Sequence, residues 1–343
     1  MRKVPKGQMS RLISGSFLGV LGVAVLAFGV LHFGDLESFG QMLRQAQPLW
    51  LLAAAGLQVI TYMSVSLGWK LVLDKAGSAR GLIPLIPVAL SKLFADAIIP
   101  AAGMGGNIVL VDRLVKLGVP RGAAVAALLI TMIGYYAAFA MFALLMLLML
   151  WLHGKATPLL AGVVTAFLLV ALAIPSLALW LRRRGSHPLS PFLEHIPVVH
   201  SLLHVVGEAP AKLLADRSLL AGVAACNASI FLVDAATLQV CLFALGHPTG
   251  YSTAFIALMG ASILAALAPI PMGLGGFEAG STAMLSLLGV PVPVALGGTL
   301  LLRGFTLWLP LLPGLVIMRG SFRQNHRGHD SSLDKVRPSP KSD

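Results

Sequence analysis

Apolar residues in this chain are grouped in long runs rather than in the short alternating patterns of a soluble fold. A helix needs about 20 apolar residues to cross the hydrocarbon of a bilayer, because lipid offers no hydrogen-bond partners to its backbone. Six runs meet this length and are predicted to be transmembrane helices. They are Leu12–Phe33, Pro48–Leu73, Arg121–Leu152, Pro158–Leu181, Ser218–Leu245 and Val292–Met318.

Two further apolar stretches are interrupted by proline and glycine and are predicted to be re-entrant or discontinuous segments. They are Leu82–Gly106, with Pro84, Pro87, Pro100 and Gly103, and Ser252–Leu288, with Pro269, Pro271, Gly273 and Gly275. Proline removes a helical hydrogen bond, and glycine permits backbone conformations outside the helix. The pattern predicts an all-α polytopic membrane protein with about six full spans plus two re-entrant or discontinuous segments. These form a single integral membrane domain over residues 1–319.

Clusters of lysine and arginine predict how the chain is oriented. They are Arg2, Lys3, Lys6 and Arg11 at the start, then Lys70, Lys75 and Arg80, then Arg182–Arg184, and finally Arg319, Arg323 and Arg327. Because cytoplasmic loops carry the excess of positive residues, we expect a multi-pass protein of the bacterial inner membrane with both termini in the cytoplasm. This arrangement requires each interrupted segment to return to the side from which it entered. Residues 188–216 are predicted to be an amphipathic surface helix, and residues 320–343 a disordered cytoplasmic tail.

Composition removes several classes of function. The chain is 57% hydrophobic and 11% charged, and its net charge of +12 comes from basic clusters between apolar runs rather than from a basic patch on a polar domain. We therefore expect no nucleic-acid partner. Cys226 and Cys241 lie in one apolar run, where they are predicted to be packing residues and neither a disulfide framework nor a zinc site. No cofactor is expected, and no ATP-binding loop of the Gly-x-x-x-x-Gly-Lys-Ser/Thr type occurs.

A motif recurs in the two interrupted stretches. Pro100-Ala-Ala-Gly-Met-Gly-Gly106, followed by Leu117-Gly-Val-Pro120, is matched by Pro271-Met-Gly-Leu-Gly-Gly276, followed by Leu288-Gly-Val-Pro291, at an offset of 170 or 171 residues. The repeat copies are approximately residues 48–152 and 218–318, and the charge pattern predicts opposite orientations for them. Inverted repeats with discontinuous segments are typical of transporters that bind substrate where the repeats meet. The alternative is a duplication retained in a structural protein.

Ionisable residues near the motif are candidates for substrate binding, because charge is costly at membrane depth. Glu278 and Arg303 could pair with one another or together hold a zwitterionic or anionic head group. The glycines would let backbone amides approach a phosphate, although close helix packing explains such glycines equally well. The predicted substrate-binding residues are Gly273, Gly275, Gly276, Glu278 and Arg303 in the second copy, and Gly103, Gly105, Gly106, Asn107, Asp96 and Arg113 in the first.

Two other groups of polar residues have a functional and a structural interpretation. Asp234 is an intramembrane carboxylate, and it either has a function or forms a hydrogen bond with Asn227 or Thr237. His200, His204 and Glu208 share a helical face by their spacing, but a metal site needs a further ligand, so wet interfacial side chains are favoured over a metal site.

The second copy of the motif, Pro269-Ile-Pro-Met-Gly-Leu-Gly-Gly-Phe-Glu278, followed by Leu302-Arg-Gly-Phe-Thr-Leu-Trp-Leu-Pro-Leu-Leu-Pro-Gly314, resembles the membrane region of bacterial lysylphosphatidylglycerol synthases. The resemblance extends to a family of flippase-like integral membrane proteins and covers nearly the whole chain. It implies lipid translocation without aminoacyl transfer. The family pattern falls on Pro271, Gly273, Gly275, Glu278 and Arg303, and more loosely on Gly105, Gly106 and Asn107.

These patterns favour a lipid or lipid-linked amphiphile translocase over an enzyme, because no nucleophile with an adjacent base is recognisable at membrane depth. The alternative is a non-transporting scaffold or accessory subunit for envelope lipid or polysaccharide synthesis. The expected partners are membrane lipids, with a lipid-modifying or glycosyl-transferring enzyme and a second copy of the chain as further candidates.

Overall fold

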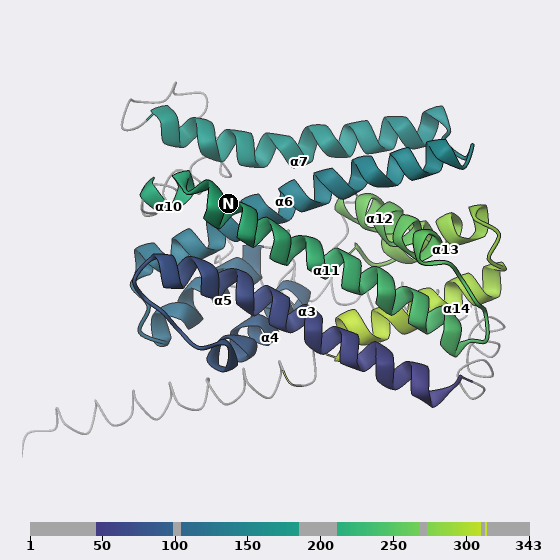
Figure 1. The fold of residues 1–343 in the computed structure, drawn as a ribbon, viewed down its shortest axis with the longest axis horizontal. Coiled ribbons are helices and arrows are strands. Elements are labelled where there is room, and N and C mark those ends of the chain that lie inside the picture. Colours follow the sequence, from purple (N-terminus) through teal and green to yellow (C-terminus); the bar gives the residue numbers. More distant parts are fainter. Residues whose placement is uncertain (1–45, 99–103, 185–210, 268–272, 310–312, 314–343) are drawn as a thin grey trace, which may run out of the picture.

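The computed structural model describes residues 46–98, 104–184, 211–267, 273–309 and 313, and the chain is helical within these ranges (Figure 1). Several predicted features lie outside them, namely the span Leu12–Phe33, the residues Gly103, His200, His204 and Glu208, and the tail 320–343. The helices are α3 (Pro48–Lys75), α4 (Leu82–Ile98), α5 (Met104–Lys116), α6 (Arg121–Leu152), α7 (Pro158–Arg184), α10 (Ala211–Ala215), α11 (Arg217–Ala244), α12 (Tyr251–Leu267), α13 (Gly276–Leu287) and α14 (Val292–Arg303).

Three of the described helices, α3, α6 and α11, are long and apolar enough to cross a bilayer. They confirm three of the predicted spans to within a few residues. The predicted fourth span is the continuous helix α7, and the predicted sixth begins as α14 and continues into a π-helix over Gly304–Trp308. Of the predicted surface helix, the described part is the single turn α10, which packs against α6 and α11.

The antiparallel pair of α3 and α11 forms the centre of the molecule. The two helices pack against each other along their length (Figure 1). At one end, the Gln47 amide donates to the Ala244 carbonyl at 3.0 Å. At the other end, Lys75 Nζ lies 3.1 Å from Asp216 Oδ2. Contacts at both ends hold this pair in a fixed register.

Each interrupted stretch folds into a pair of packed helices, α4 with α5 and α12 with α13. We call these pairs the first and second hairpins. The prediction that Pro84 and Pro87 interrupt the helix was wrong, because α4 continues through both. Pro84 lies in the first helical turn, where the missing N–H has no intrahelical partner to lose. The described helices end at Ile98 and Leu267 and begin again at Met104 and Gly276.

The outer ends of the two hairpins lie at opposite ends of α6. Before α4, the Arg80 guanidinium donates to the carbonyls of Leu117 and Gly118, at 3.0 and 2.9 Å, so the first hairpin begins and ends beside the start of α6. Beyond the far end of α6, Lys155 Nζ donates to the Leu287 carbonyl at the end of α13, at 2.8 Å. Helix α6 has 32 residues, which at about 1.5 Å per residue separates these ends by roughly 48 Å.

The repeated Leu-Gly-Val-Pro sequence has the same local structure at the end of both hairpins. Gly118 and Gly289 have φ angles of 79° and 95°, which other residues rarely adopt. After α5, the Val119 amide donates to the Leu114 carbonyl at 3.1 Å, and after α13, Val290 donates to Leu285 at 3.0 Å. These bonds satisfy carbonyls that a helix end leaves open, and the proline that follows is the N-cap of the next helix.

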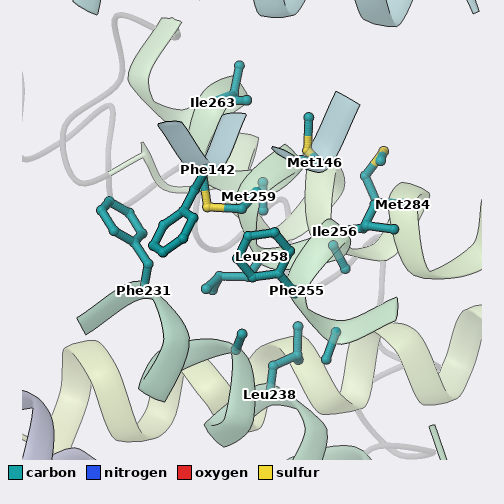
Figure 2. Close-up of a cluster of buried hydrophobic side chains, with 14 of the residues drawn as sticks. Phe142, Met146, Phe231, Leu238, Phe255, Ile256, Leu258, Met259, Ile263 and Met284 are labelled. Atoms are coloured by element: carbon teal, nitrogen blue, oxygen red, sulfur yellow. The ribbon is translucent and has the colours of Figure 1, made fainter. Parts of the chain in front are cut away.

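Two hydrophobic cores surround the hairpins, and α6 and α11 contribute to both. The first hairpin packs in a core with the end of α3 and the first halves of α6 and α11. The second hairpin packs with the second halves of α6 and α11, and with α7 and α14. Figure 2 shows the second core, where Phe142, Phe231 and Phe255 meet methionines from α6, α12 and α13. Each hairpin thus packs against a different half of α6 and α11.

Candidate functional site

Glu278 and Arg303 form an ion pair at the inner end of the second hairpin, the end at which the chain passes from α12 to α13. Arg303 Nε lies 2.7 Å from Glu278 Oε1, and the two side chains are 11% and 17% exposed, respectively. Glu278 is in the first turn of α13, and Arg303 is the last residue of α14. A charge-assisted bond of this length in a mostly enclosed setting is stronger than an exposed ion pair. The structure therefore brings together the two charged residues that the sequence singled out in this copy.

The same carboxylate also caps the start of α13. Its second oxygen, Oε2, accepts the backbone N–H of Gly275 at 2.7 Å. Gly275 has a φ of 82° and Gly273 a φ of 62°, so the turn leading into α13 depends on glycine at both positions. At Gly273 the space is also restricted, because a Cβ would lie 2.6 Å from the Cβ of Ala265 on α12. The Glu278 carboxylate thus binds the Arg303 guanidinium through one oxygen and caps the N-terminus of α13 through the other.

Arg303 is held by its aromatic neighbour as well as by Glu278. Its guanidinium carbon lies 4.5 Å from the centre of the Phe277 ring, which is a cation–π contact. Directly after Arg303 the chain changes from α-helix to the π-helix Gly304–Trp308. Such π segments are rare and occur often at functional sites. We regard Glu278, Arg303, Phe277 and Gly275 as the candidate site of the second hairpin.

The first hairpin carries a group with the same chemistry. Lys92 Nζ lies 2.6 Å from Asp96 Oδ2 on α4, and Asp96 Oδ1 accepts the backbone N–H of Gly106 at 2.9 Å. The two side chains are 26% and 25% exposed. Each hairpin therefore has a carboxylate that binds a cation through one oxygen and a backbone amide of the repeated glycine motif through the other.

The two groups are built from different positions of the repeat. In the second hairpin the carboxylate comes from α13 itself and the cation from the next helix, whereas in the first hairpin both come from α4. The Asp96 and Glu278 carboxylates share no hydrogen-bond or ion-pair partner among the described residues. The structure thus gathers the predicted residues into two groups and does not join these through a common partner.

The other predicted site residues occupy different positions. Gly105 lies in the first turn of α5 and Gly276 is the first residue of α13. Asn107 is half-buried on α5 and forms no hydrogen bond to Asp96. Arg113 lies in the last turn of α5, seven residues after Gly106, which places it about 10 Å along the helix from the inner end.

Lys92 and Phe277 are parts of these groups that the sequence interpretation missed. Lys92 and Asp96 are four residues apart in a mostly apolar segment. Opposite charges pair at this spacing on a helix, so the spacing was an available signal. Phe277 had no such signal, because its contact with Arg303 depends on how α14 packs against α13.

Asp234 on α11 belongs to a separate buried polar cluster with α3. Its Oδ1 accepts a hydrogen bond from Gln58 Nε2 at 3.2 Å and another from the Thr61 hydroxyl at 3.1 Å. Gln58 Nε2 also donates to Thr237 Oγ1 at 3.2 Å. Asn227 instead donates to the Val223 carbonyl of its own helix at 2.8 Å. Of the two candidate partners Asn227 and Thr237, Thr237 belongs to the cluster, through Gln58 rather than by a direct bond to Asp234.

Comparison with models of known protein families gives a match over most of the chain. A family model described as the lysylphosphatidylglycerol synthase TM region matches residues 16–314, which include every described helix and both candidate groups. A search of the curated proteins finds no match to the chain.

Proposed function

Because the chain belongs to the lysylphosphatidylglycerol synthase TM region family, we propose that this membrane protein is a lipid translocase of the bacterial inner membrane. Its substrate would be a lipid or lipid-linked amphiphile that moves between the two leaflets. Movement would take place along the inner ends of the two hairpins. The observation that carries the proposal is the duplicated group of cation, carboxylate and glycine amide.

The arrangement of the hairpins supports an inverted repeat. The first hairpin opens at the end of α6 next to Arg80, and the second opens at the end next to Lys155. In a bilayer that α6 crosses, the two would be re-entrant from opposite sides, which is the geometry of transporters with alternating access. The matching turns at Gly118 and Gly289 support a common origin of the two copies.

The charge distribution supports an orientation with the first hairpin opening to the cytoplasm. Basic residues concentrate where the first hairpin opens: Lys70, Lys75, Arg80, Lys116, Arg121, Lys212 and Arg217 all lie near this end. At the opposite end, the loop after α6 contributes the basic residue Lys155. Since cytoplasmic loops carry the excess of lysine and arginine, this asymmetry favours the cytoplasm for the first hairpin.

The site in the second hairpin suits a head group with negative charge. Arg303 and the Gly275 amide both donate to Glu278, and a phosphate oxygen could replace the carboxylate on either donor. An amine on the same head group would then pair with the displaced Glu278. Lys92, Asp96 and the Gly106 amide offer a second set of the same donors and acceptor. A lipid that moves from the site in one hairpin to the site in the other would find partners for its charged head group at both. This lowers the free-energy cost of moving the head group through the membrane.

The proposal is tested by following fluorescent phospholipids between leaflets in liposomes that contain the purified protein. Wild type, Glu278→Gln and Arg303→Ala would be compared with Asp112→Asn, which breaks an exposed ion pair of 2.9 Å with Lys116 on α5. We expect Asp112→Asn to match wild type and the site variants to be slower by about tenfold or more, the effect of losing ~1.4 kcal/mol of binding.

Two results would count against the proposal. One is the absence of movement for every class of phospholipid tried, anionic, zwitterionic and cationic. The other is equal movement by wild type and Glu278→Gln. In the second case, transport would not involve this ion pair, and a scaffolding role for the pair would be favoured.

A further inference from the structure

Asp234 is the only carboxylate in the described part of α11 beyond its N-cap, and it lies deep within the helix. It is followed by ten residues before the helix ends at Ala244, which places it about 15 Å from that end. The other end is about 25 Å away. Asp234 therefore lies at membrane depth if α11 crosses the bilayer, where an ionised side chain is costly.

The surroundings of Asp234 supply hydrogen bonds but no positive charge. Within the described residues, its partners are the Gln58 amide and the Thr61 hydroxyl, and no lysine, arginine or histidine pairs with it. Gln58 is 1% exposed and Thr61 is 7% exposed, so this cluster is enclosed. By contrast, Asp96 and Glu278 both have a cation. A carboxylate at this depth without a cation is neutralised most cheaply by a proton.

The titratable groups that face Asp234 do not supply a charge either. They are Tyr62 on α3 and Tyr135 on α6, both near enough for an electrostatic interaction. From α12, Tyr251 donates to the Leu232 carbonyl at 2.9 Å, and from α14, Arg303 pairs with Glu278. Lys212 on α10 is exposed at the far end of α11. Asp234 is therefore a buried carboxylate that no charged side chain of the described residues faces.

A proton fits the cluster better than a metal cation does. A hard cation is surrounded by oxygen lone pairs, usually six or more. Gln58 instead directs its amide hydrogens at both Asp234 and Thr237, and Thr61 directs its hydroxyl hydrogen at Asp234. These donors complement the lone pairs of a carboxylate. When protonated, the same carboxyl could in turn donate, so the bonds between α3 and α11 depend on its charge.

We propose that Asp234, with Gln58 and Thr61, is a proton-binding site that couples proton movement to lipid movement. This inference rests on the proposed translocase function and assigns its energy source. The location suits coupling, because α3 leads directly into the first hairpin and α11 leads into the second. A change in the bonds between these two helices would alter the position of one hairpin relative to the other, as alternating access requires.

The coupling is tested in liposomes with an imposed pH gradient. With one proton per lipid, a gradient of one pH unit shifts the final distribution of a fluorescent lipid between leaflets by up to about tenfold. Wild type and the control Asp112→Asn should show this shift, and dissipating the gradient should abolish it. Asp234→Asn, which keeps an acceptor for Gln58 and Thr61, should move lipid to an even distribution that the gradient does not change. A sodium gradient at constant pH should have no effect on any of them.

Proton binding is tested separately by infrared difference spectroscopy of the protein in lipid as the pH is varied. Wild type and Asp112→Asn should show a protonated carboxyl band that titrates, and Asp234→Asn should lack it. Absence of the band in wild type overturns the proton site, whether or not lipid moves. Lipid movement by wild type that ignores the pH gradient overturns the coupling and leaves the translocase function standing. Absence of any lipid movement overturns the translocase function, and the infrared titration then still decides whether Asp234 binds a proton.

Discussion

The Asp96 carboxylate occupies the space that a side chain on Gly106 would need. A Cβ on Gly106 would lie 2.2 Å from Asp96 Oδ1, while the Gly106 amide donates to that same oxygen at 2.9 Å. A larger residue at this position therefore has to displace the Asp96 carboxylate from the Gly106 amide. This contact links a residue of the repeated motif to the helix that precedes the gap.

We expect Gly106→Ala to destabilise the protein by about 1–3 kcal/mol, because the added methyl group displaces Asp96 and leaves a polar group without its partner. Gly56→Ala is the matched control, since a Cβ there meets nothing within 4 Å and alanine favours the helix. Thermal unfolding in detergent measures both. A Gly106→Ala protein as stable as the control would show that the contact between Asp96 and Gly106 is dispensable.

Exchanging the two charges of the second hairpin should not restore function. In the double variant Glu278→Arg with Arg303→Glu, opposite charges remain, but the Gly275 amide loses its carboxylate cap. An arginine at the start of α13 also opposes the helix dipole. We expect the double variant to be no faster in lipid movement than Glu278→Arg alone. Recovery by the exchange would mean that the ion pair matters and the cap does not.

Alanine in place of Gly298 on α14 is expected to be tolerated only when the Leu242 side chain on α11 is shortened as well. A Cβ on Gly298 would lie 2.5 Å from Leu242 Cδ2, and Leu242 is fully buried and cannot move aside freely. Gly298→Ala should cost about 1–3 kcal/mol by overpacking, and Leu242→Ala about 2–5 kcal/mol by leaving a cavity. The double variant should lose less than the sum, which a double-mutant cycle of unfolding measurements determines. Strict additivity would contradict this packing.

Asp216 should stabilise the start of α11 in a pH-dependent manner. Its side chain accepts the Leu219 amide at 3.0 Å and pairs with Lys75, and these two bonds hold the pKa of Asp216 below its usual value. A lowered pKa means that the stabilisation is complete above the ordinary aspartate range, about pH 4, and is lost as the pH falls through the lowered value. Asp216→Ala should therefore lower the thermal midpoint at neutral pH and make no difference in strong acid.

Asp216→Ser separates the two contributions, because serine caps a helix but cannot pair with Lys75. The thermal midpoint of this variant should lie between those of wild type and Asp216→Ala. Equal midpoints for Asp216→Ala and wild type at neutral pH would be inconsistent with the cap at Leu219.

The sequence by itself determined the helical class, three of the long spans, the location of both hairpins and the pairing candidates Glu278 and Arg303. These features follow from short-range rules, since the length of an apolar run decides whether it can span a bilayer, and proline and glycine act on the turn in which they lie. Glu278 could be recognised in this way because it is in the first turn after the glycines.

Only the tertiary structure decided which side chains meet across helices. Asp96 accepts the Gly106 amide in the first hairpin because α4 folds back against α5. Asp234 found its partners on α3, and Gln58 lies 176 residues before it in the chain. The rotation and register of two packed helices set such pairs, and these depend on the shapes of both surfaces at once. A periodic pattern within one helix carries no record of them.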